Sequence, residues 1–455
     1  MDKTTIESTT AHKTNIVAVV TMFFLFAMIS FVTNLAAPIG TIWKGHYEWA
    51  GMIGNFMNFL AYLFMGIPAG NMLSKYGYKK TALCALAVGA LGILVQYLSS
   101  LLGANVATFS VNGQPVMLNY LIYLLGAFIS GFCVCMLNTV VNPMLNLLGG
   151  GGRRGNQLLQ AGGSFNSLAG TLTPFFVGML VGTVTASTSM ADVDVLLWIA
   201  FAVFVVSFLV ICFVNIPEPQ TKGKTERRKY PHSPWSFRHT VLGVIGIFFY
   251  VGLEVGIPGV LIFYLSSPEL GLENGVALAG GIAAIYWLLM LVGRLISSAV
   301  SGYVSSKTQL IFTTLLAITL IVLAIFISAD VKISMPAYSV EDGVSLAKVP
   351  IKALFLVLCG LCTSVMWGGI FNLAVEGLGK YTAKASGIFM MMVVGGGVMP
   401  LIQETIGRTV GWMASYWLVI AMLLYLFFYA AIGSKNVNKN IPVDEDDLEQ
   451  IPDSL

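Results

Sequence analysis

The chain has 455 residues, of which 57% are hydrophobic and 10% are charged, and its formal net charge is +3. Soluble domains carry about 25% charged residues, so this composition excludes a soluble globular protein and predicts a polytopic membrane protein. Basic loops beside a membrane explain the small positive balance, which makes a nucleic-acid partner unnecessary.

Twelve apolar runs along the chain are long enough to cross a membrane as helices. A crossing needs about 20 apolar residues, because a helix rises 1.5 Å per residue and the hydrocarbon layer is about 30 Å thick. The runs of the first half cover residues 16–39, 51–73, 81–102, 118–148, 158–184 and 195–214. The runs of the second half cover residues 241–265, 277–300, 310–327, 353–374, 385–406 and 412–432. The sequence therefore predicts an all-α membrane protein with twelve transmembrane helices.

Basic residues give these helices an orientation. Cytoplasmic loops hold an excess of lysine and arginine, and most of the 24 basic residues here fall in segments on the same side as the N-terminus. We therefore expect both termini to be cytoplasmic. A basic stretch at 217–238 predicts a cytoplasmic central loop, which separates an N-terminal six-helix bundle, 1–216, from a C-terminal six-helix bundle, 239–433. Residues 434–455 are expected to form a disordered acidic cytoplasmic tail.

Weak internal similarity favours two equivalent halves. Asn142 in the fourth run corresponds to Asn372 in the tenth, and Pro174 in the fifth run corresponds to Pro400 in the eleventh. Such repeats are typical of transporters whose two bundles rock about a central site.

The seventh run contains the acid with the most apolar surroundings, Glu254, within Phe249-Tyr-Val-Gly-Leu-Glu-Val-Gly-Ile-Pro258. A carboxylate at bilayer depth costs about 2.5 to 3.5 kcal/mol on insertion scales, so it usually faces a cavity, a partner or an ion path. Three roles are open for Glu254: a protonatable switch, a Na+ ligand together with backbone carbonyls near Pro258, or a structural partner of Arg294 in the eighth run. The first two roles would make Glu254 the ion-coupling residue.

Amides take the place of acids in the runs of the first half. At helical spacing they predict polar faces on several helices, and the candidate substrate-binding amides are Asn34, Asn58, Asn138, Asn142, Gln160 and Asn166. An interhelical hydrogen bond explains any one of them equally well, whereas the set predicts a water-filled cavity. Tyr286 and Trp367 of the second half would add apolar faces for a sugar ring, or would pack in the core. We therefore expect a transporter for a neutral, hydroxyl-rich solute.

Other kinds of site are excluded by residue placement. The six cysteines lie within apolar runs and the four histidines lie outside them, so no metal site is expected. The glycine-rich stretch 149–155 lacks the ending of a phosphate loop, so no ATP-driven engine is expected. The runs contain no paired acids or activated nucleophile in recognisable spacing, so we do not expect an enzyme.

The stretch between the second and third runs resembles a loop signature of the major facilitator superfamily. It reads Gly70-Asn-Met-Leu-Ser-Lys-Tyr-Gly-Tyr-Lys-Lys80, with Ser74 where the family usually has an acid. The glycine would allow close helix approach, and the basic residues suit helix termini and the inner membrane face. The expected gating or structural residues are Gly70, Lys75, Lys79, Lys80 and Arg294.

Two further motifs, Leu137-Asn-Thr-Val-Val-Asn-Pro-Met144 and Ser164-Phe-Asn-Ser167, resemble the fucose permease and glucose/galactose permease group of that superfamily. The resemblance implies a two-bundle fold and a sugar substrate. It also implies acids where this chain has Asn34 and Asn138, and a glutamine where it has Gly163. Because amides do not take up protons near neutral pH, the proton route of the fucose permease cannot be carried over.

These features together predict a secondary transporter that imports a neutral monosaccharide by alternating access, a hexose or deoxyhexose such as fucose, glucose or galactose. We expect H+ or Na+ as the coupling ion, no other cofactor, and a monomer whose partners are the sugar and the lipid bilayer. Its expected location is a bacterial inner (plasma) membrane, which it crosses many times. The alternatives are an uncoupled sugar facilitator and an exporter of small amphipathic molecules.

Overall fold

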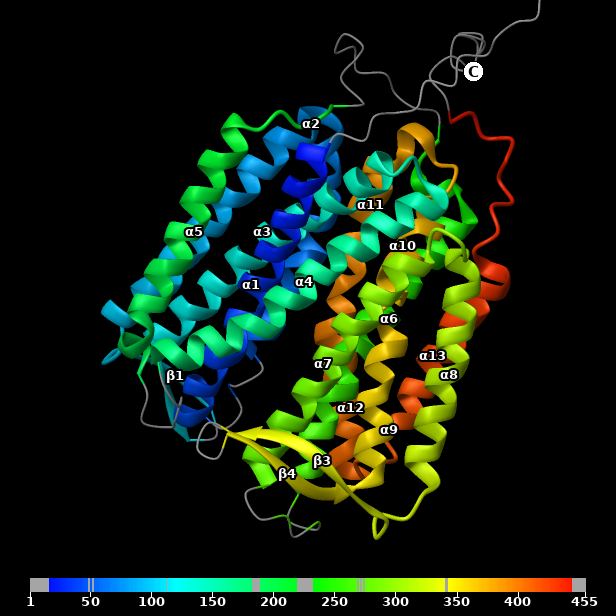
Figure 1. Ribbon diagram of the computed structural model, residues 1–455. Helices are drawn as coiled ribbons and strands as arrows, with labels where there is room; N and C mark the ends of the chain where they lie inside the picture. The colour runs from blue at the N-terminus through cyan, green and yellow to red at the C-terminus, as the bar shows by residue number, and fades with distance from the viewer. Residues whose placement is uncertain are drawn as a thin grey trace, which may run out of the picture.

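The computed structural model describes residues 16–47, 50, 53–111, 113–181, 189–218, 232–267, 270, 272, 275–339 and 343–443. Within these residues the chain is built almost entirely of helices, which run side by side in two groups (Figure 1). Parts of several predicted segments fall outside the described residues, among them 51–52 and 182–184 of two apolar runs, 219–231 of the expected central loop and 444–455 of the expected tail.

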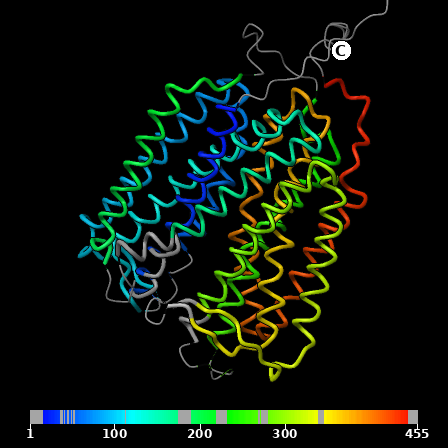
Figure 2. Tube along the Cα trace, viewed as in Figure 1, coloured from blue at the N-terminus to red at the C-terminus, as the bar shows by residue number. Residues whose placement is uncertain are grey.

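The N-terminal group contains helices α1 to α5, coloured from blue to green in Figure 2. Their bounds are α1 Ile16–His46, α2 Ile53–Leu101, α3 Leu118–Leu148, α4 Gly152–Val181 and α5 Asp194–Phe213, with a short 3-10 turn, η1, at Met190–Val193. Helix α2 covers two predicted runs. At Gly77 its backbone adopts a φ of 84°, so its 49 residues form two helical segments that join at a glycine.

The C-terminal group contains helices α6 to α13. Their bounds are α6 Arg238–Leu265, α7 Gly275–Val300, α8 Ser306–Phe326, α9 Ile351–Thr363, α10 Met366–Val375, α11 Thr382–Met391, α12 Gly395–Thr409 and α13 Tyr416–Phe428. Short turns accompany them, namely η2 Pro234–Ser236, η4 Gly379–Tyr381, η5 Met392–Val394 and the π turn η6 Tyr429–Gly433. The predicted runs 353–374 and 385–406 are therefore interrupted, the second at the turn η5. Three consecutive glycines, which are poor helix formers, follow this turn at the start of α12.

Ten segments of the described residues are long and apolar enough to cross a membrane. They confirm the predicted all-helical, membrane-spanning core. The longest of them, α2, has 49 residues and would measure about 74 Å if it were straight, which exceeds one crossing of about 30 Å.

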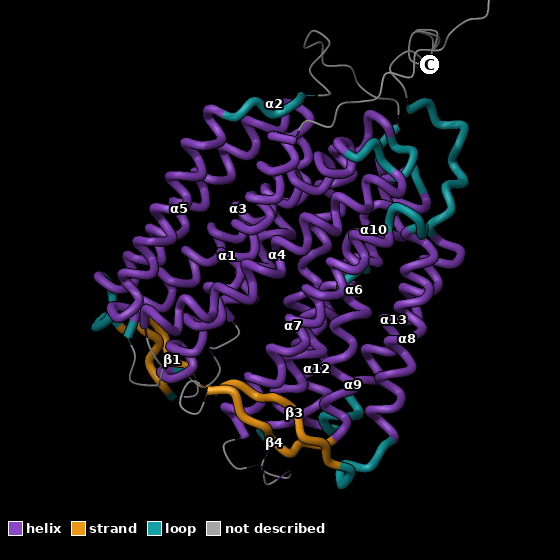
Figure 3. The backbone as a smooth tube through the Cα atoms, viewed as in Figure 1, coloured by secondary structure: helices purple, strands orange, loops and turns teal. Residues whose placement is uncertain are grey.

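Two β-hairpins occur within the described residues, and the apolar runs did not predict them. Strand β1 (Ala107–Val111) pairs antiparallel with β2 (Gln114–Met117), and β3 (Lys332–Ser339) pairs antiparallel with β4 (Gly343–Pro350). Figure 3 shows both hairpins at one end of the helices. We call this end the hairpin side. The opposite end, which carries Gly77, Arg154 and Lys307, is called the basic side.

The two groups of helices contact each other chiefly on the basic side. Glycines of α2 and α11 meet there, since a Cβ atom added to Gly70 would lie 2.9 Å from the Cα atom of Gly387. From this contact α4 and α7 diverge toward the hairpin side (Figure 1). A second seam continues along α2 and α12, where Gly396 packs against Phe59. The protein is therefore closed on the basic side, and α4 and α7 are apart on the hairpin side.

The break at Gly77 is held by the chain that follows α5. The carboxylate of Glu218 accepts hydrogen bonds from the backbone N–H groups of Tyr78 and Lys79, at 2.8 Å each, and so occupies free donors at a helix N-terminus. The Lys79 ammonium donates to two carbonyl oxygens at the end of α5, 2.8 and 2.9 Å away. Lys79 therefore joins α2 to α5, a structural use of one of the predicted basic residues.

Residues 434–443 of the expected tail lie against the C-terminal group. The Asn438 side chain accepts a hydrogen bond of 3.0 Å from the N–H of Arg238, the first residue of α6. The Val443 carbonyl accepts one of 3.3 Å from the N–H of Lys380. The expected disorder stays a prediction for residues 444–455, which lie outside the described residues.

Candidate functional site

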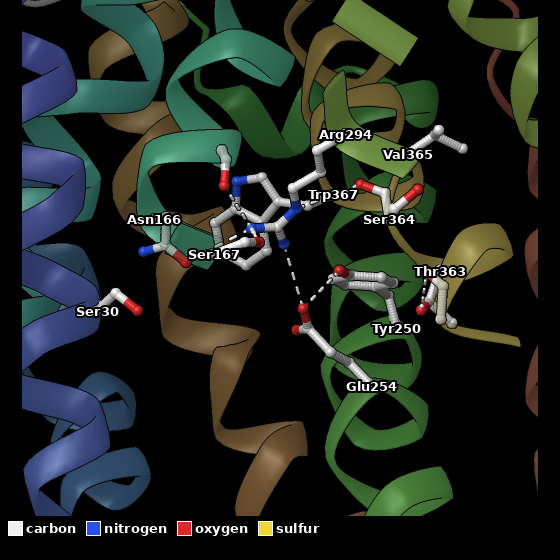
Figure 4. A network of polar contacts seen from close by, with 12 residues as sticks. Ser30, Asn166, Ser167, Tyr250, Glu254, Arg294, Thr363, Ser364, Val365 and Trp367 are labelled. Carbon is white, nitrogen blue, oxygen red and sulfur yellow. Dashed lines mark hydrogen bonds and ion pairs between the residues drawn. The ribbon is translucent and has the colours of Figure 1, made fainter. Parts of the chain in front are cut away.

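An ion pair lies between α6 and α7, where the two groups of helices meet. Nη2 of Arg294 is 3.3 Å from Oε1 of Glu254, and the Tyr250 hydroxyl donates to the same oxygen at 2.8 Å (Figure 4). The side chains of Arg294 and Glu254 are 8% and 14% exposed. Charges at this depth are costly and mark functional positions in membrane proteins. Of the three roles open to Glu254, pairing with Arg294 is therefore present in this state.

The same arginine also bonds the other group of helices. Its Nη1 donates to the carbonyl of Gly163 at 2.9 Å, to the hydroxyl of Ser167 at 2.8 Å and, at 3.4 Å, to the amide oxygen of Asn166, all on α4. Gly163 makes room for this approach, because a Cβ atom there would lie 3.3 Å from Cδ of Arg294. Arg294 thus connects a carboxylate on α6 with three oxygens on α4.

A chain of hydrogen bonds crosses between the two groups beside this pair. The indole N–H of Trp367 on α10 donates to the amide oxygen of Asn142 at 2.8 Å. Asn142 donates to the carbonyl of Asn138 at 2.8 Å and to its side-chain oxygen at 3.3 Å. Asn138 donates to the Tyr62 hydroxyl on α2 at 2.9 Å. We call these four residues the amide relay.

The indole ring of Trp367 lies beside two other rings. Its centroid is 6.2 Å from that of Tyr250 and 6.0 Å from that of Phe389. Since the Tyr250 hydroxyl bonds Glu254, the amide relay ends beside the ion pair. Together the two networks form one polar and aromatic centre between the helix groups.

Further polar contacts close the basic side. The Asn146 amide donates to the side-chain oxygen of Asn372 at 2.7 Å, and Asn372 donates to the Ser306 hydroxyl at 2.9 Å. The Gln160 amide donates to the Val365 carbonyl at 2.9 Å. These bonds join α3 and α4 to the C-terminal helices. They place Gln160, a predicted sugar ligand, in the contact between the groups.

Several predicted site residues lie away from this centre or bond within their own group. Asn34 donates to the carbonyl of Ser30 on its own helix at 2.8 Å. The Asn58 side chain points to α3, since its amide oxygen would lie 3.0 Å from a Cβ atom on Gly131. The Tyr286 hydroxyl bonds the Thr363 hydroxyl at 2.8 Å inside the C-terminal group. The structure thus brings together Asn138, Asn142, Asn166, Trp367, Glu254 and Arg294.

Three hydroxyl side chains of this centre were not among the predicted site residues, namely Tyr62, Ser167 and Tyr250. Each lies close in helical spacing to a predicted residue on the same helix, so the periodicity of polar residues was a usable signal. Lys75 and Lys80 of the predicted gating group are exposed on the basic side.

Potential metal-ligating side chains do not gather in the part of the chain that the structure describes. No group of three or more His, Cys, Asp or Glu side chains is assembled there.

A small cavity of about 60 Å³ lies between α2, α6 and α12, lined mainly by glycines and apolar side chains with Asn55 and Glu404. It lies apart from the amide relay and does not include Arg294.

Two helical groups that meet at a polar centre, with a charged pair in the membrane interior, define a polytopic transport protein. The Major Facilitator Superfamily model matches residues 18–400. The chain belongs to this superfamily, and it is a multi-pass membrane protein.

Sequence relatives cover nearly the whole chain. It is 28% identical over 437 residues to the glucose/galactose transporter of Brucella abortus, which covers 91% of this chain and 93% of the relative. It is also 28% identical over 431 residues to a putative glucose/galactose transporter of Helicobacter pylori, with 91% and 95% covered. The predicted resemblance to the fucose and glucose/galactose permease group is confirmed.

Solved structures share the fold. A single-residue variant of the fucose:proton symporter FucP of E. coli superposes with a TM-score of 0.71 at 19% identity, covering 92% of this chain and all of that one. The proton:xylose symporter XylE superposes with a TM-score of 0.62 at 12% identity, covering 92% and 97%. The two-bundle arrangement is therefore that of these transporters.

Proposed function

We propose that this protein is a secondary transporter that imports a neutral monosaccharide, a hexose or deoxyhexose, by cation-coupled alternating access. The ion pair of Glu254 and Arg294 carries the proposal, because it lies in the membrane interior and its arginine bonds both groups of helices. The relatives named as glucose/galactose transporters support a sugar as the substrate. Amide groups bond hydroxyls, and aromatic rings cover the apolar face of a sugar.

The proposal includes twelve membrane crossings with both termini in the cytoplasm of a bacterial inner membrane. Helix α2 crosses twice, once on each side of Gly77, whereas α9 with α10 and α11 with α12 form one crossing each. The basic side then faces the cytoplasm, in line with the excess of lysine and arginine expected there. The state with the basic side closed is accordingly the outward-facing one.

The ion pair gives a physical reason for coupling. In the outward-facing state Glu254 neutralises Arg294 where water has little access. When H+ or Na+ binds Glu254, Arg294 becomes a poorly compensated cation, and a buried unpaired charge costs several kcal/mol. Opening the basic side relieves this cost, because water then reaches the guanidinium as it leaves Gly163 and Ser167. Cation binding therefore favours the inward-facing state.

The remaining features of the proposal are simple. The protein acts as a monomer in the lipid bilayer, with the sugar as its small-molecule partner. It needs H+ or Na+ and no other cofactor, it is not an enzyme, and it has no nucleic-acid partner. The competing candidate is an uncoupled sugar facilitator, which is favoured by Asn34 and Asn138 standing where the fucose permease has acids.

Uptake into proteoliposomes tests the proposal. A panel of labelled monosaccharides is offered under an imposed H+ gradient or Na+ gradient, to the wild type and to Glu254→Gln. We expect one gradient to drive accumulation in the wild type. In Glu254→Gln we expect only equilibration, because the amide cannot take up the ion.

Glu404→Gln is the matched control, since Glu404 is a carboxylate on α12 that pairs with Arg408, near the hairpin side. This variant should accumulate sugar like the wild type. Gradient-independent equilibration in all three proteins would identify an uncoupled facilitator, and no uptake of any sugar would contradict the proposed substrate class.

A further inference from the structure

Two of the predicted sugar ligands have their amide groups occupied by the protein. The amide nitrogen of Asn142 donates to two oxygens of Asn138, and the side-chain oxygen of Asn142 accepts the indole N–H of Trp367. Asn138 accepts from Asn142 and donates to Tyr62. Asn142 is 0% exposed and Asn138 is 5% exposed. A sugar would reach these amides only by displacing hydrogen bonds that already exist.

The amide relay reaches the central site at one end only. Tyr62 is 5% exposed, whereas Trp367 is partly exposed. The indole ring lies beside Tyr250 and, through it, beside Glu254. An indole has a single hydrogen-bond donor, so a bond from that N–H to Asn142 fixes the rotation of the ring. The buried part of the relay therefore controls which way an aromatic face is turned.

We infer that Asn142 is a positioning residue, which holds the ring of Trp367 in the orientation that receives the sugar and does not bind the sugar itself. This inference rests on the proposed sugar transport. It reassigns Asn138 and Tyr62 as well, since they hold Asn142 in turn. Trp367 remains the residue that contacts the sugar, through the stacking of its ring on the apolar face.

The relay also links sugar affinity to the closure of the basic side. Trp367 belongs to the C-terminal group of helices, whereas Asn142, Asn138 and Tyr62 belong to the N-terminal group. Opening the basic side separates Trp367 from Asn142 and frees the ring to rotate, which lowers the affinity for the sugar. By thermodynamic reciprocity, bound sugar favours the closed basic side until the cation shifts the equilibrium. Sugar is thus held outward-facing and released inward-facing.

A double-mutant cycle on purified protein tests the positioning role, with binding of the labelled sugar at equilibrium as the readout. Trp367→Phe keeps a ring but removes the N–H. On the wild-type background Asn142→Ala should weaken binding about fivefold, the effect of one lost hydrogen bond. On the Trp367→Phe background the same substitution should have no further effect, because the bond is already absent.

Asn166→Ala gives the matched cycle, since Asn166 bonds Phe26 and Arg294 and not the relay. Its effect should be the same on both backgrounds. If Asn142→Ala also weakens binding equally on both backgrounds, Asn142 binds the sugar directly and the inference is wrong.

A second measurement needs no sugar and so separates this inference from the proposed function. The chain has eight tryptophans, and subtracting the emission of Trp367→Phe from that of the wild type isolates Trp367. Asn142→Ala should increase the quenching of that component by aqueous acrylamide, whereas Asn166→Ala should not. Unchanged quenching in Asn142→Ala would overturn the positioning role even if sugar is transported.

Discussion

The two groups of helices bring different chemistry to their contact. The N-terminal group contributes neutral amides, hydroxyls and a backbone carbonyl, whereas the C-terminal group contributes the charged pair and the aromatic rings. A carboxylate changes its charge when it binds a cation, and an amide does not. The C-terminal group can therefore change its charge when an ion binds, whereas the N-terminal group offers hydrogen-bond partners whose charge stays the same. Because Arg294 bonds both groups, the proposed binding of a cation within the C-terminal group would reach the contact with the N-terminal one.

Replacing Arg294 should disturb this division of roles between the two groups more than any other substitution. Arg294→Met leaves Glu254 without its cation and removes three contacts to α4, so we expect transport to be lost. Breaking one partner of a buried ion pair costs about 3 to 5 kcal/mol, which thermal unfolding in detergent will detect. The double variant Glu254→Gln/Arg294→Met should recover much of the stability without the transport. Full transport by Arg294→Met would contradict the proposed role of the pair.

A wedge between the two groups tests the closed basic side. Gly387 packs on Gly66 and Gly70, so Gly387→Val forces their backbones apart at an expected cost of about 1 to 3 kcal/mol to the closed state. We expect the variant to favour the inward-facing state and to bind sugar weakly. Gly280→Val is the control, because a Cβ atom there meets nothing within 4 Å among the described residues. Equal sugar binding in both variants would argue against this contact as the closure.

The bond between Asn146 and Asn372 offers a smaller test of the same contact. Each alanine substitution should destabilise the closed state by about 1 kcal/mol, and the double variant should cost little more than either single one. The measurement is the rate at which a cysteine-reactive dye enters from the basic side. Thr319→Ala, at an exposed position on α8 that bonds only its own helix, should leave the rate unchanged. Additive effects would show that the two amides act separately.

Removing the bonds by which Lys79 joins α2 to α5 should have the smallest effect. Lys79→Ala removes the donor to the carbonyls at the end of α5, an interaction worth about 0.3 to 1 kcal/mol. Thermal unfolding should show this loss, with transport largely retained. Lys80→Ala, one residue further on and exposed, should unfold like the wild type. Equal losses of stability in the two variants would mean that the lost positive charge, and not the bonds between α2 and α5, is responsible.

Composition predicted the helical core but not the hairpins. Burying unpaired polar backbone in lipid is costly, so a membrane span is a helix of mostly apolar residues. The spans could therefore be identified as long apolar runs in the sequence. The hairpins lie between the runs, where Asn112-Gly113 was an available turn signal that the apolar pattern did not use. The break of the run at 353–374 into α9 and α10 had no comparable sign in the sequence.

The sequence predicted which types of residue form the site, but it predicted only some of the residues to which they bond. Helical periodicity places Asn58 and Asn138 on polar faces, but a face can meet either a cavity or a neighbouring helix. Asn58 packs against Gly131 of α3, because a glycine allows this close approach. Tyr286 bonds the hydroxyl of Thr363 on α9. The pairing of Glu254 with Arg294 was one of three roles that the sequence left open. The contact between α6 and α7 shows that pairing, whereas the two ion-coupling roles stay predictions.

The distance between the basic ends of the two groups, measured by pulsed electron resonance, tests the coupling most directly. Spin labels are placed at Arg154 on α4 and at Tyr303 after α7, both exposed, with Cys212 replaced by serine because it is the exposed one among the described cysteines. The wild type without cation should show the short distance of the closed basic side. Glu254→Gln, which imitates the cation-bound carboxylate, should shift the population to a longer distance. An unchanged distribution in Glu254→Gln would contradict the claim that this carboxylate controls the closure.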